Sequence, residues 1–425
     1  MWFIFKGLFY LAGGGVTLTA GLASYLAFLQ PPLYFPQPTG EHAVGTVTYH
    51  LVDETRKGLT SSDTGHPHKE LMVQVWYPAQ GKVSSVALAP HDPVLKSYLK
   101  QNSKLGWLLT MSRPAYSYAV KDAPLFGEND EHLPVIIFSH GMGCTRNMNT
   151  AHCEELASKG YVVIGVSHSF GGSVVKFPDG RVVAMNAIEQ QRQQQQMLVS
   201  PMDFFRESND KIGIWIDDVQ MVLDELEKFT VDQTSPFYDR LDMNNIGMIG
   251  HSYGGAATVQ LCRRDSRIKA GVDMDGPLFG ADATQGFDKP IMFLLAPPMS
   301  EAYMEEQMKN AGMAPAGIQE YSRATCESFH PAIDSLIDGM GHDAYKITLQ
   351  NSGHMAFCDM AIMKEGNPLS GCLQSFGAGS INGYRATEIV NAHLVAFFDK
   401  YLKNKPSELL DGSGTEFPEC MIERR

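Results

Sequence analysis

Short, continuously apolar runs rich in β-branched residues alternate with helical segments along most of this chain. Two clear examples are residues 135–138 (VIIF) and 162–166 (VVIGV). Strands that are buried on both faces have this composition, because both of their sides pack against other elements. Parallel neighbours need long, usually helical connections, so alternating strands and helices indicate a mostly parallel sheet. The pattern therefore predicts an α/β fold with a mostly parallel central sheet flanked by helices.

The expected elements can be placed by residue range. We expect strands at 46–51, 71–77, 135–139, 162–167, 246–250, 268–274, 291–295 and 344–349, and helices at 203–229, 254–263 and 387–402. No internal repeat divides this stretch. We therefore expect one folded domain over residues 46–425.

The N-terminal segment has a different character. Residues 7–29 carry no charged side chain and are mostly apolar. A helix of that length crosses the ~30 Å hydrocarbon core of a bilayer, whereas the apolar part of a secretory signal is usually only ~7–15 residues long. We expect residues 1–29 to be a single-pass membrane anchor, with a cleaved signal or a buried helix as the alternatives. A Pro/Gly-rich linker is expected at 30–45.

The charge around this segment predicts its orientation. Lys6 precedes it, and the next charged residue is Glu41. The positive-inside bias then places the N-terminus in the cytosol and the folded domain in a lumen or outside the cell. If the segment is cleaved, the domain is expected to be secreted.

The overall charge argues against nucleic acid as a partner. The chain has 34 Lys and Arg against 47 Asp and Glu, a net charge of −13, and no long basic block. Such a surface repels a phosphate backbone. The chain also contains no phosphate-binding loop, dinucleotide fingerprint or zinc-ligand spacing. We therefore expect no nucleic acid, no cofactor and no metal.

A basic amphipathic stretch covers residues 94–113. Its lysines recur every fourth residue, at Lys96, Lys100 and Lys104, among leucines and a tryptophan. A helix of this kind can lie on an anionic lipid surface. A lid helix that packs on the domain with its lysines in water is an equally good interpretation.

Residues 250–254 (GHSYG) match the pattern G-x-S-x-G. An apolar strand runs directly into the motif, and a helix rich in small residues follows it. This strand–turn–helix context is that of a nucleophile elbow, which exposes a serine hydroxyl at a sharp turn. Ser252 is therefore the candidate nucleophile. The alternative is a glycine-rich turn with an inert serine.

A serine nucleophile needs a base to take its proton and an acid to orient that base. In this arrangement the chain order is serine, acid, histidine, each beyond the end of a strand. Asp275 ends the strand expected at 268–274 and is the favoured acid. Asp273, two residues earlier and on the same face of the strand, is the alternative.

His354 is the favoured base, because it follows the strand expected at 344–349. His330 and His342 are weaker candidates, since they lie in a polar excursion and follow no strand. The catalytic residues expected from the sequence are therefore Ser252, Asp275 and His354.

Negative charge on a tetrahedral intermediate needs backbone N–H donors. One donor is expected to be Tyr253, the residue after the nucleophile, and the second should come from the loop after an early strand. The loop at residues 139–143 (SHGMG) fits, and Met142 is the expected donor. His140 is expected to pack within this loop.

Together these segments resemble the plasma/type II (group VII phospholipase A2) family of platelet-activating factor acetylhydrolases, in the α/β-hydrolase superfamily. The likeness covers roughly residues 65–405. It is carried by residues 73–78 (VQVWYP), 138–143 (FSHGMG), 250–256 (GHSYGGA), 275–279 (DGPLF) and 354–359 (HMAFCD). The four later segments occur in the family's order, which is far more specific than the pentapeptide alone.

The resemblance implies a calcium-independent serine esterase with phospholipase A2 activity. Family members hydrolyse short or oxidised sn-2 acyl chains of phospholipids, often at lipid surfaces. The resemblance also assigns the nucleophile, acid and base to Ser252, Asp275 and His354, and the oxyanion amides to Met142 and Tyr253. A phospholipid substrate and a membrane or lipid-particle surface are thus the expected partners.

The chain departs from the family in two places. The acid and the histidine are 79 residues apart, with a Met-rich excursion at about 299–341, and Gly276 and Pro277 stand where bulkier residues are expected near the acyl pocket. Both differences bear on acyl-chain preference rather than on the chemistry.

Two other functions fit the sequence. One is a general carboxylesterase, or a dienelactone-hydrolase-like enzyme, acting on soluble esters. The other is an inactive α/β-hydrolase that serves as a binding module. The presence of all three triad candidates argues against the inactive module.

Overall fold

The structure, a computed structural model, describes residues 32–58, 66–81, 115–127, 132–169, 171–172, 174–184, 192, 195–196, 199–298, 309, 315–365, 377–412 and 416–425. The expected anchor at 1–29 and the basic stretch at 94–113 lie outside these residues. Within the described part of the chain, no helix is both long enough and apolar enough to cross a bilayer.

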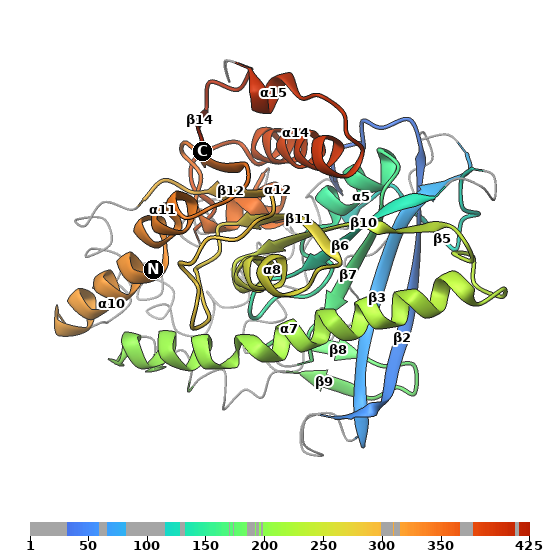
Figure 1. Ribbon diagram of the computed structural model, residues 1–425, viewed down its shortest axis with the longest axis horizontal. Coiled ribbons are helices and arrows are strands. Elements are labelled where there is room, and N and C mark those ends of the chain that lie inside the picture. The colour runs from blue at the N-terminus through green and yellow to red at the C-terminus, as the bar shows by residue number, and fades with distance from the viewer. Residues whose placement is uncertain are drawn as a thin grey trace, which may run out of the picture.

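The described residues contain a ten-stranded sheet with the strand order β14-β13-β12-β11-β10-β6-β7-β3-β2-β5 (Figure 1). Its six central strands are parallel: β13 (Ala344–Leu349), β12 (Ile291–Leu295), β11 (Ile268–Met274), β10 (Leu241–His251), β6 (Leu133–Ser139) and β7 (Val162–Ser167). The outer strands β14 (Cys420–Arg424), β3 (His68–Ala79) and β2 (Ala43–Lys57) run antiparallel to a neighbour, and β5 (Ala119–Lys121) runs parallel to β2. The predicted mostly parallel sheet is confirmed.

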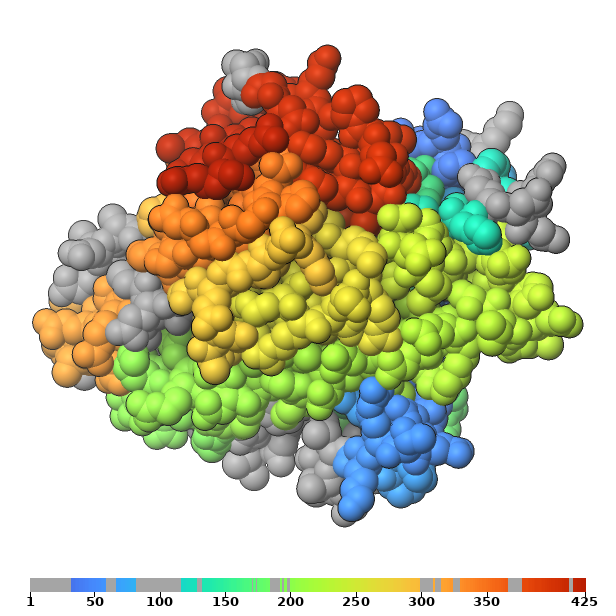
Figure 2. Space-filling model, in the orientation of Figure 1, coloured from blue at the N-terminus to red at the C-terminus, as the bar shows by residue number. Residues whose placement is uncertain are grey.

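Helices cover both faces of the sheet. One face carries α5 (Thr150–Ser158) and α14 (Gly383–Leu402), and the other carries α7 (Pro201–Val231), α8 (Tyr253–Arg264) and α11 (His330–Asp338). Figure 2 shows α7 as a continuous green band across the molecule. The remaining elements are short or peripheral: β1 (Leu33–Tyr34), β4 (Ala115–Tyr116), β8 (Val174–Lys176), β9 (Val182–Ala184), α10 (Pro315–Ser328), η1 (His354–Phe357), α12 (Met360–Met363) and α15 (Glu408–Asp411).

The apolar runs of the central strands follow from this layering. In β6, Val135 and Ile137 belong to the core beneath α7, whereas Ile136 and Phe138 belong to the core beneath α14. Successive side chains of a strand point to opposite faces. Because both faces are covered, every residue of β6 and β7 is buried.

The segment expected as a linker is instead partly packed on the domain. Leu33 and Phe35 are buried against Ile362 of α12, and the backbone and hydroxyl of Thr39 donate to the Glu155 carboxylate of α5. β2 already begins at Ala43. These apolar side chains are buried because they pack against Ala151 of α5 and Ile362 of α12. The folded domain therefore begins before residue 46.

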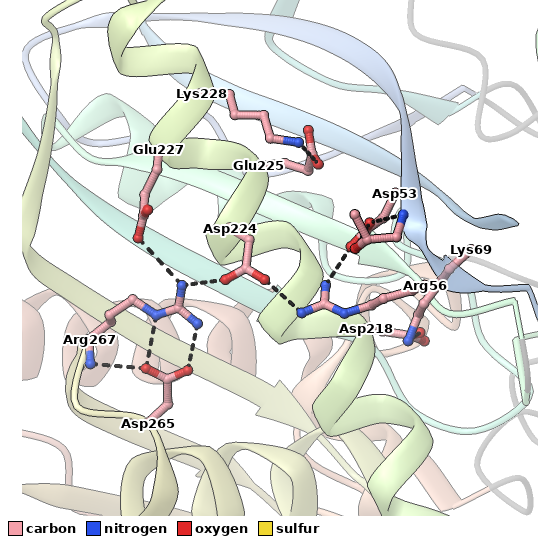
Figure 3. Close-up of polar contacts among 11 residues, drawn as sticks. Asp53, Arg56, Lys69, Asp218, Asp224, Glu225, Glu227, Lys228, Asp265 and Arg267 are labelled. Carbon is pink, nitrogen blue, oxygen red and sulfur yellow. Dashed lines mark hydrogen bonds and ion pairs between the residues drawn. The ribbon is translucent and has the colours of Figure 1, made fainter.

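The Met-rich excursion also contains regular structure. α10 and α11 lie within it, and the apolar face of α11 packs on β12. An ion-pair network joins α7 to the end of β2 and to the turn that follows α8 (Figure 3). Asp224 of α7 accepts from Arg56 and from Arg267, each at 2.7 Å, and Arg267 also pairs with Asp265 at 2.8 Å.

Candidate active site

The carboxyl ends of the central strands bring the predicted site residues to one edge of the sheet. Ser252 follows β10, Asp275 follows β11 and His354 follows the turn after β13. Neighbouring parallel strands end on the same side, where open α/β sheets bind their ligands. Segments far apart in the chain therefore meet at this edge.

The structure places these three side chains in one hydrogen-bonded row. His354 Nε2 lies 2.9 Å from Ser252 Oγ, and His354 Nδ1 lies 2.7 Å from Asp275 Oδ2. The side chain of His354 is 37% exposed and that of Asp275 only 9%. A substrate can thus approach the serine and the histidine, while the acid stays inside. This is the geometry of a serine nucleophile with its base and orienting acid.

Ser252 sits in a strained turn, with φ 58° and ψ −121°. Non-glycine residues rarely adopt such a conformation. The turn is held by a hydrogen bond from the Ser252 backbone N–H to the Met274 carbonyl, at 2.9 Å. The backbone is also crowded, since a Cβ on Gly250 or Gly254 would lie about 2 Å from the carbonyl oxygens of Gly254 and Ser139, respectively. The motif's two glycines are therefore required by close packing.

Each oxygen of the Asp275 carboxylate has its own hydrogen-bond partner, and this fixes the side chain beside His354. Its Oδ1 accepts a hydrogen bond from the Ala296 backbone N–H at 2.8 Å, and its Oδ2 faces His354. Burial opposes ionisation, but the hydrogen bond and charge of His354 outweigh it and lower the pKa of Asp275 below its usual value. The acid is therefore a carboxylate at neutral pH.

Asp273, the alternative acid, lies deeper in the core. It is fully buried, and its Oδ1 accepts from the Gly276 backbone N–H at 2.8 Å. Burial raises its pKa well above the usual range. A neutral carboxyl group that bonds a backbone amide does not orient the histidine, so the geometry favours Asp275.

The other candidate histidines have different partners. His330 begins α11, and its Nε2 lies 3.1 Å from the Ala296 carbonyl oxygen. His342 is exposed, and its Nδ1 accepts from the Asp343 backbone N–H. The hydrogen bond of Ser252 Oγ is made with His354.

The loop after β6 lies directly over the serine. A Cβ on Gly141 would be 3.1 Å from the Cβ of Ser252, so the backbone leading to Met142 passes close to the nucleophile. Tyr253 is the first residue of α8, and its amide belongs to the free N–H groups of a helix N-terminus. Tyr253 directly follows Ser252, and Gly141, which precedes Met142, lies against Ser252.

Sequence reasoning missed a second histidine at this site. His251 Nε2 donates a hydrogen bond to the backbone carbonyl of His354 at 2.9 Å. Burial lowers the pKa of His251 to about 3, so its ring is neutral. Its place within the pentapeptide was visible, but nothing in the sequence pointed to this partner.

Fold and site together define a serine hydrolase whose architecture is consistent with the α/β-hydrolase class. Among known proteins, the sequence model of one family matches residues 29–415. The chain belongs to this family, described as platelet-activating factor acetylhydrolase, isoform II.

Individual relatives are more distant. The chain is 25% identical to a probable 1-alkyl-2-acetylglycerophosphocholine esterase of Arthroderma benhamiae, over 96% of this chain and 98% of that protein. It is 27% identical to a platelet-activating factor acetylhydrolase of Cavia porcellus, over 56% of this chain and 57% of the relative. Among solved structures, a ferulic acid esterase from Streptomyces cinnamoneus superimposes with a TM-score of 0.63 at 27% identity, over 92% of this chain and 99% of that one.

Proposed function

We propose that this chain is a calcium-independent serine esterase that hydrolyses the short or oxidised sn-2 acyl ester of phospholipids. The observation that carries the chemistry is the hydrogen-bonded row from Ser252 through His354 to Asp275. Family membership and the names of the relatives support the substrate class.

In the proposed reaction, Ser252 Oγ attacks the ester carbonyl carbon while His354 Nε2 takes its proton. As the bond between the carbonyl carbon and the glycerol oxygen breaks, the same nitrogen gives that proton to the departing oxygen, so that a lysophospholipid leaves and an acyl-serine remains. Water, activated by His354, hydrolyses this acyl-enzyme and releases the short acid. Asp275 holds the imidazole in the required tautomer and stabilises its charged form.

The backbone amides of Met142 and Tyr253 are the proposed oxyanion donors. Each such donor is worth about 2.7–4 kcal/mol of transition-state stabilisation in comparable sites. The close approach of Gly141, the residue before Met142, to Ser252 supports the first of these two assignments.

We infer further that residues 1–29 anchor the enzyme in a membrane, with the catalytic domain in a lumen or outside the cell, or secreted if this segment is cleaved. The charge-free stretch at 7–29, preceded by Lys6, supports this topology. The chain that follows packs at Leu33 and Phe35 against α12, the helix next to η1, which starts at His354. An anchor attached there would keep the site close to lipid.

A general esterase acting on soluble esters is the second candidate function. The similarity to a ferulic acid esterase, over nearly the whole of both chains, favours it. The two functions share the site and differ in whether a phospholipid is accepted.

The experiment is hydrolysis of 1-alkyl-2-acetylglycerophosphocholine with EDTA present, comparing the intact chain with Ser252→Ala. The soluble ester measured beside it is p-nitrophenyl acetate. Release of acetate from the phospholipid by the intact chain alone would support the proposal. Cleavage of only the soluble ester would favour the general esterase. Activity that survives in the variant would overturn the mechanism.

A further inference from the structure

A second row of serine, histidine and aspartate lies beneath the loop that carries Met142. Ser139 Oγ is 2.9 Å from His168 Nε2, and His168 Nδ1 is 2.8 Å from Asp218 Oδ2. Ser139 ends β6, His168 follows β7, and Asp218 comes from α7. The order of contacts is that of a catalytic triad, but the surroundings are different.

This row is closed to substrate. Ser139 and His168 have no exposed surface, and Asp218 is 1% exposed. The ring of Trp215 stacks on His168 at 3.8 Å, and Lys69 of β3 pairs with Asp218 Oδ1 at 2.8 Å (Figure 3). An enzyme nucleophile must reach its substrate, so this serine is no second active site. Its hydrogen bonds instead hold two strand ends and α7 together.

The row continues into the loop through His140. The backbone N–H of His168 donates to His140 Nε2 at 3.3 Å. This nitrogen is therefore an acceptor, and the proton of the neutral ring lies on Nδ1. His140 Nδ1 donates to the carbonyl oxygen of Gly141 at 2.8 Å. Burial holds the pKa of His140 well below its usual value and lowers that of His168, so both rings stay neutral.

The orientation of the Gly141 carbonyl determines the direction of the Met142 N–H, because both belong to one peptide unit. This carbonyl accepts from His140 and also from the Cys144 backbone N–H at 3.0 Å. The peptide unit between Gly141 and Met142 is planar and trans, so its C=O and its N–H point in opposite directions. Because the carbonyl oxygen is fixed on the side of His140 and Cys144, the Met142 N–H points away from these two donors.

We propose that Asp218, His168 and His140 are positioning residues that aim the Met142 amide at the developing oxyanion. Asp218 and Ser139 hold the ring of His168, the backbone of His168 holds His140, and His140 holds the peptide. None of the three reaches the reacting atoms. This inference depends on the proposed function, because it assumes that Ser252 is the nucleophile.

The main test is His140→Phe, which keeps a ring beside Trp215 and removes both ring nitrogens. Its matched control is His393→Phe. His393 is also fully buried, and its Nδ1 lies 2.8 Å from the Ile389 carbonyl oxygen, but it belongs to α14. Both variants lose one histidine-to-carbonyl bond in the core, and H140F also loses the bond that His140 Nε2 accepts from the His168 backbone N–H. H393F thus controls for the loss of a buried histidine-to-carbonyl bond away from the loop.

The readouts are kcat and KM for p-nitrophenyl acetate, with folding checked by circular dichroism. Removal of an oxyanion donor lowers kcat by about 10²–10³-fold, so a donor that is only misdirected should cost about 10- to 100-fold in H140F. KM should stay within about twofold, because the donor acts in the transition state. H393F should keep the kcat of the intact chain.

Asp218→Asn provides the second arm. This variant should also lower kcat. The double variant D218N/H140F should be no slower than H140F, because both substitutions act through the peptide between Gly141 and Met142. D218N and H393F should combine additively. If H140F does not fold, the inference is tested by comparing the kcat of D218N with that of H393F.

Unchanged kcat in folded H140F, or in D218N when that arm carries the test, would overturn the inference, as would an effect confined to KM. Ser252→Ala is measured in parallel, and activity there would overturn the proposed function itself. The two failures are thus distinguishable.

Discussion

The backbone carbonyl of His354 accepts a hydrogen bond from Nε2 of His251 at 2.9 Å, and the two rings lie 4.7 Å apart. The residue before the nucleophile therefore holds the residue that would take the nucleophile's proton. Because the pKa of His251 is only about 3, its ring remains a neutral donor at physiological pH. Nucleophile and base are positioned by one short stretch of chain.

Replacing His251 by phenylalanine is expected to lower kcat by about 10- to 100-fold, since small displacements of a catalytic group cost that much. The variant keeps the ring volume and loses the bond to the His354 carbonyl. His251→Gln, which can donate to the same oxygen, should recover part of the loss. Steady-state kinetics with p-nitrophenyl acetate measures both. Equal rates for H251F and the unmodified enzyme would contradict the positioning role.

The two aspartates after the nucleophile should differ sharply. Asp275→Asn is expected to lower kcat by about 10⁴-fold, because the amide favours the wrong imidazole tautomer. Asp273→Asn should leave kcat within about threefold, because its Oδ1 still accepts from Gly276 and a neutral carboxyl group is replaced by a neutral amide. Kinetics on the same ester separates them, and the reverse order would make Asp273 the acid.

The buried histidines should make folding stability fall in mild acid. Burial lowers the pKa of His152 to about 4, against about 6.5 in the unfolded chain. Between these values the unfolded state binds more protons, so the stabilisation is present above pH 6.5 and lost as pH falls towards 4. From pH 7 to 5.5 this group should cost about 1 kcal/mol of unfolding free energy.

Urea unfolding of His152→Gln at the two pH values checks this. Glutamine can still donate to the Asn391 Oδ1 that His152 Nδ1 contacts at 2.6 Å, but it does not titrate. The drop in stability between pH 7 and 5.5 should be smaller in the variant by about 1 kcal/mol. An identical pH slope in both proteins would show that His152 is not the titrating group.

Arg267→Met should destabilise the fold by about 1–2 kcal/mol without changing kcat. The arginine joins Asp265, which is 8% exposed, to Asp224 of α7, as Figure 3 shows. The control is Arg206→Met, whose pair with Asp203 is largely exposed and should contribute under about 0.5 kcal/mol. Urea unfolding at pH 7 measures both, and equal effects would contradict the role of this network.

The anchor proposal predicts that the full chain resists extraction from membranes by alkaline carbonate. Arginine at Leu18 and Leu22 together should release it, since each charge at the centre of a membrane helix costs about 2.5–3.5 kcal/mol. Substituting alanine at both positions is the matched control and should leave the chain in the membrane fraction. Full extraction of the unmodified chain would contradict the anchor.

Regular core elements were predictable because both faces of a central strand are apolar and short turns bound it. The predicted ranges 162–167, 268–274, 291–295 and 344–349 match β7, β11, β12 and β13 residue for residue. β5 and β14 were missed. Both are short strands at the edges of the sheet, where a strand pairs with a neighbour on one side only. Their apolar pattern in the sequence is correspondingly weak. Helices α10 and α11 were not predicted, because the apolar residues of this polar excursion show no clear helical periodicity.

The sequence by itself determined the elbow at Ser252 and the chain order of nucleophile, acid and base, since these depend on local turns at strand ends. It left Asp273 and Asp275 open, because residues two apart share one face of a strand. Only the tertiary structure decided that Asp275 meets His354 while Asp273 is buried against Gly276. The contacts of His251 and His140 likewise join segments whose separation depends on how the strands pack, and no local pattern encodes that distance.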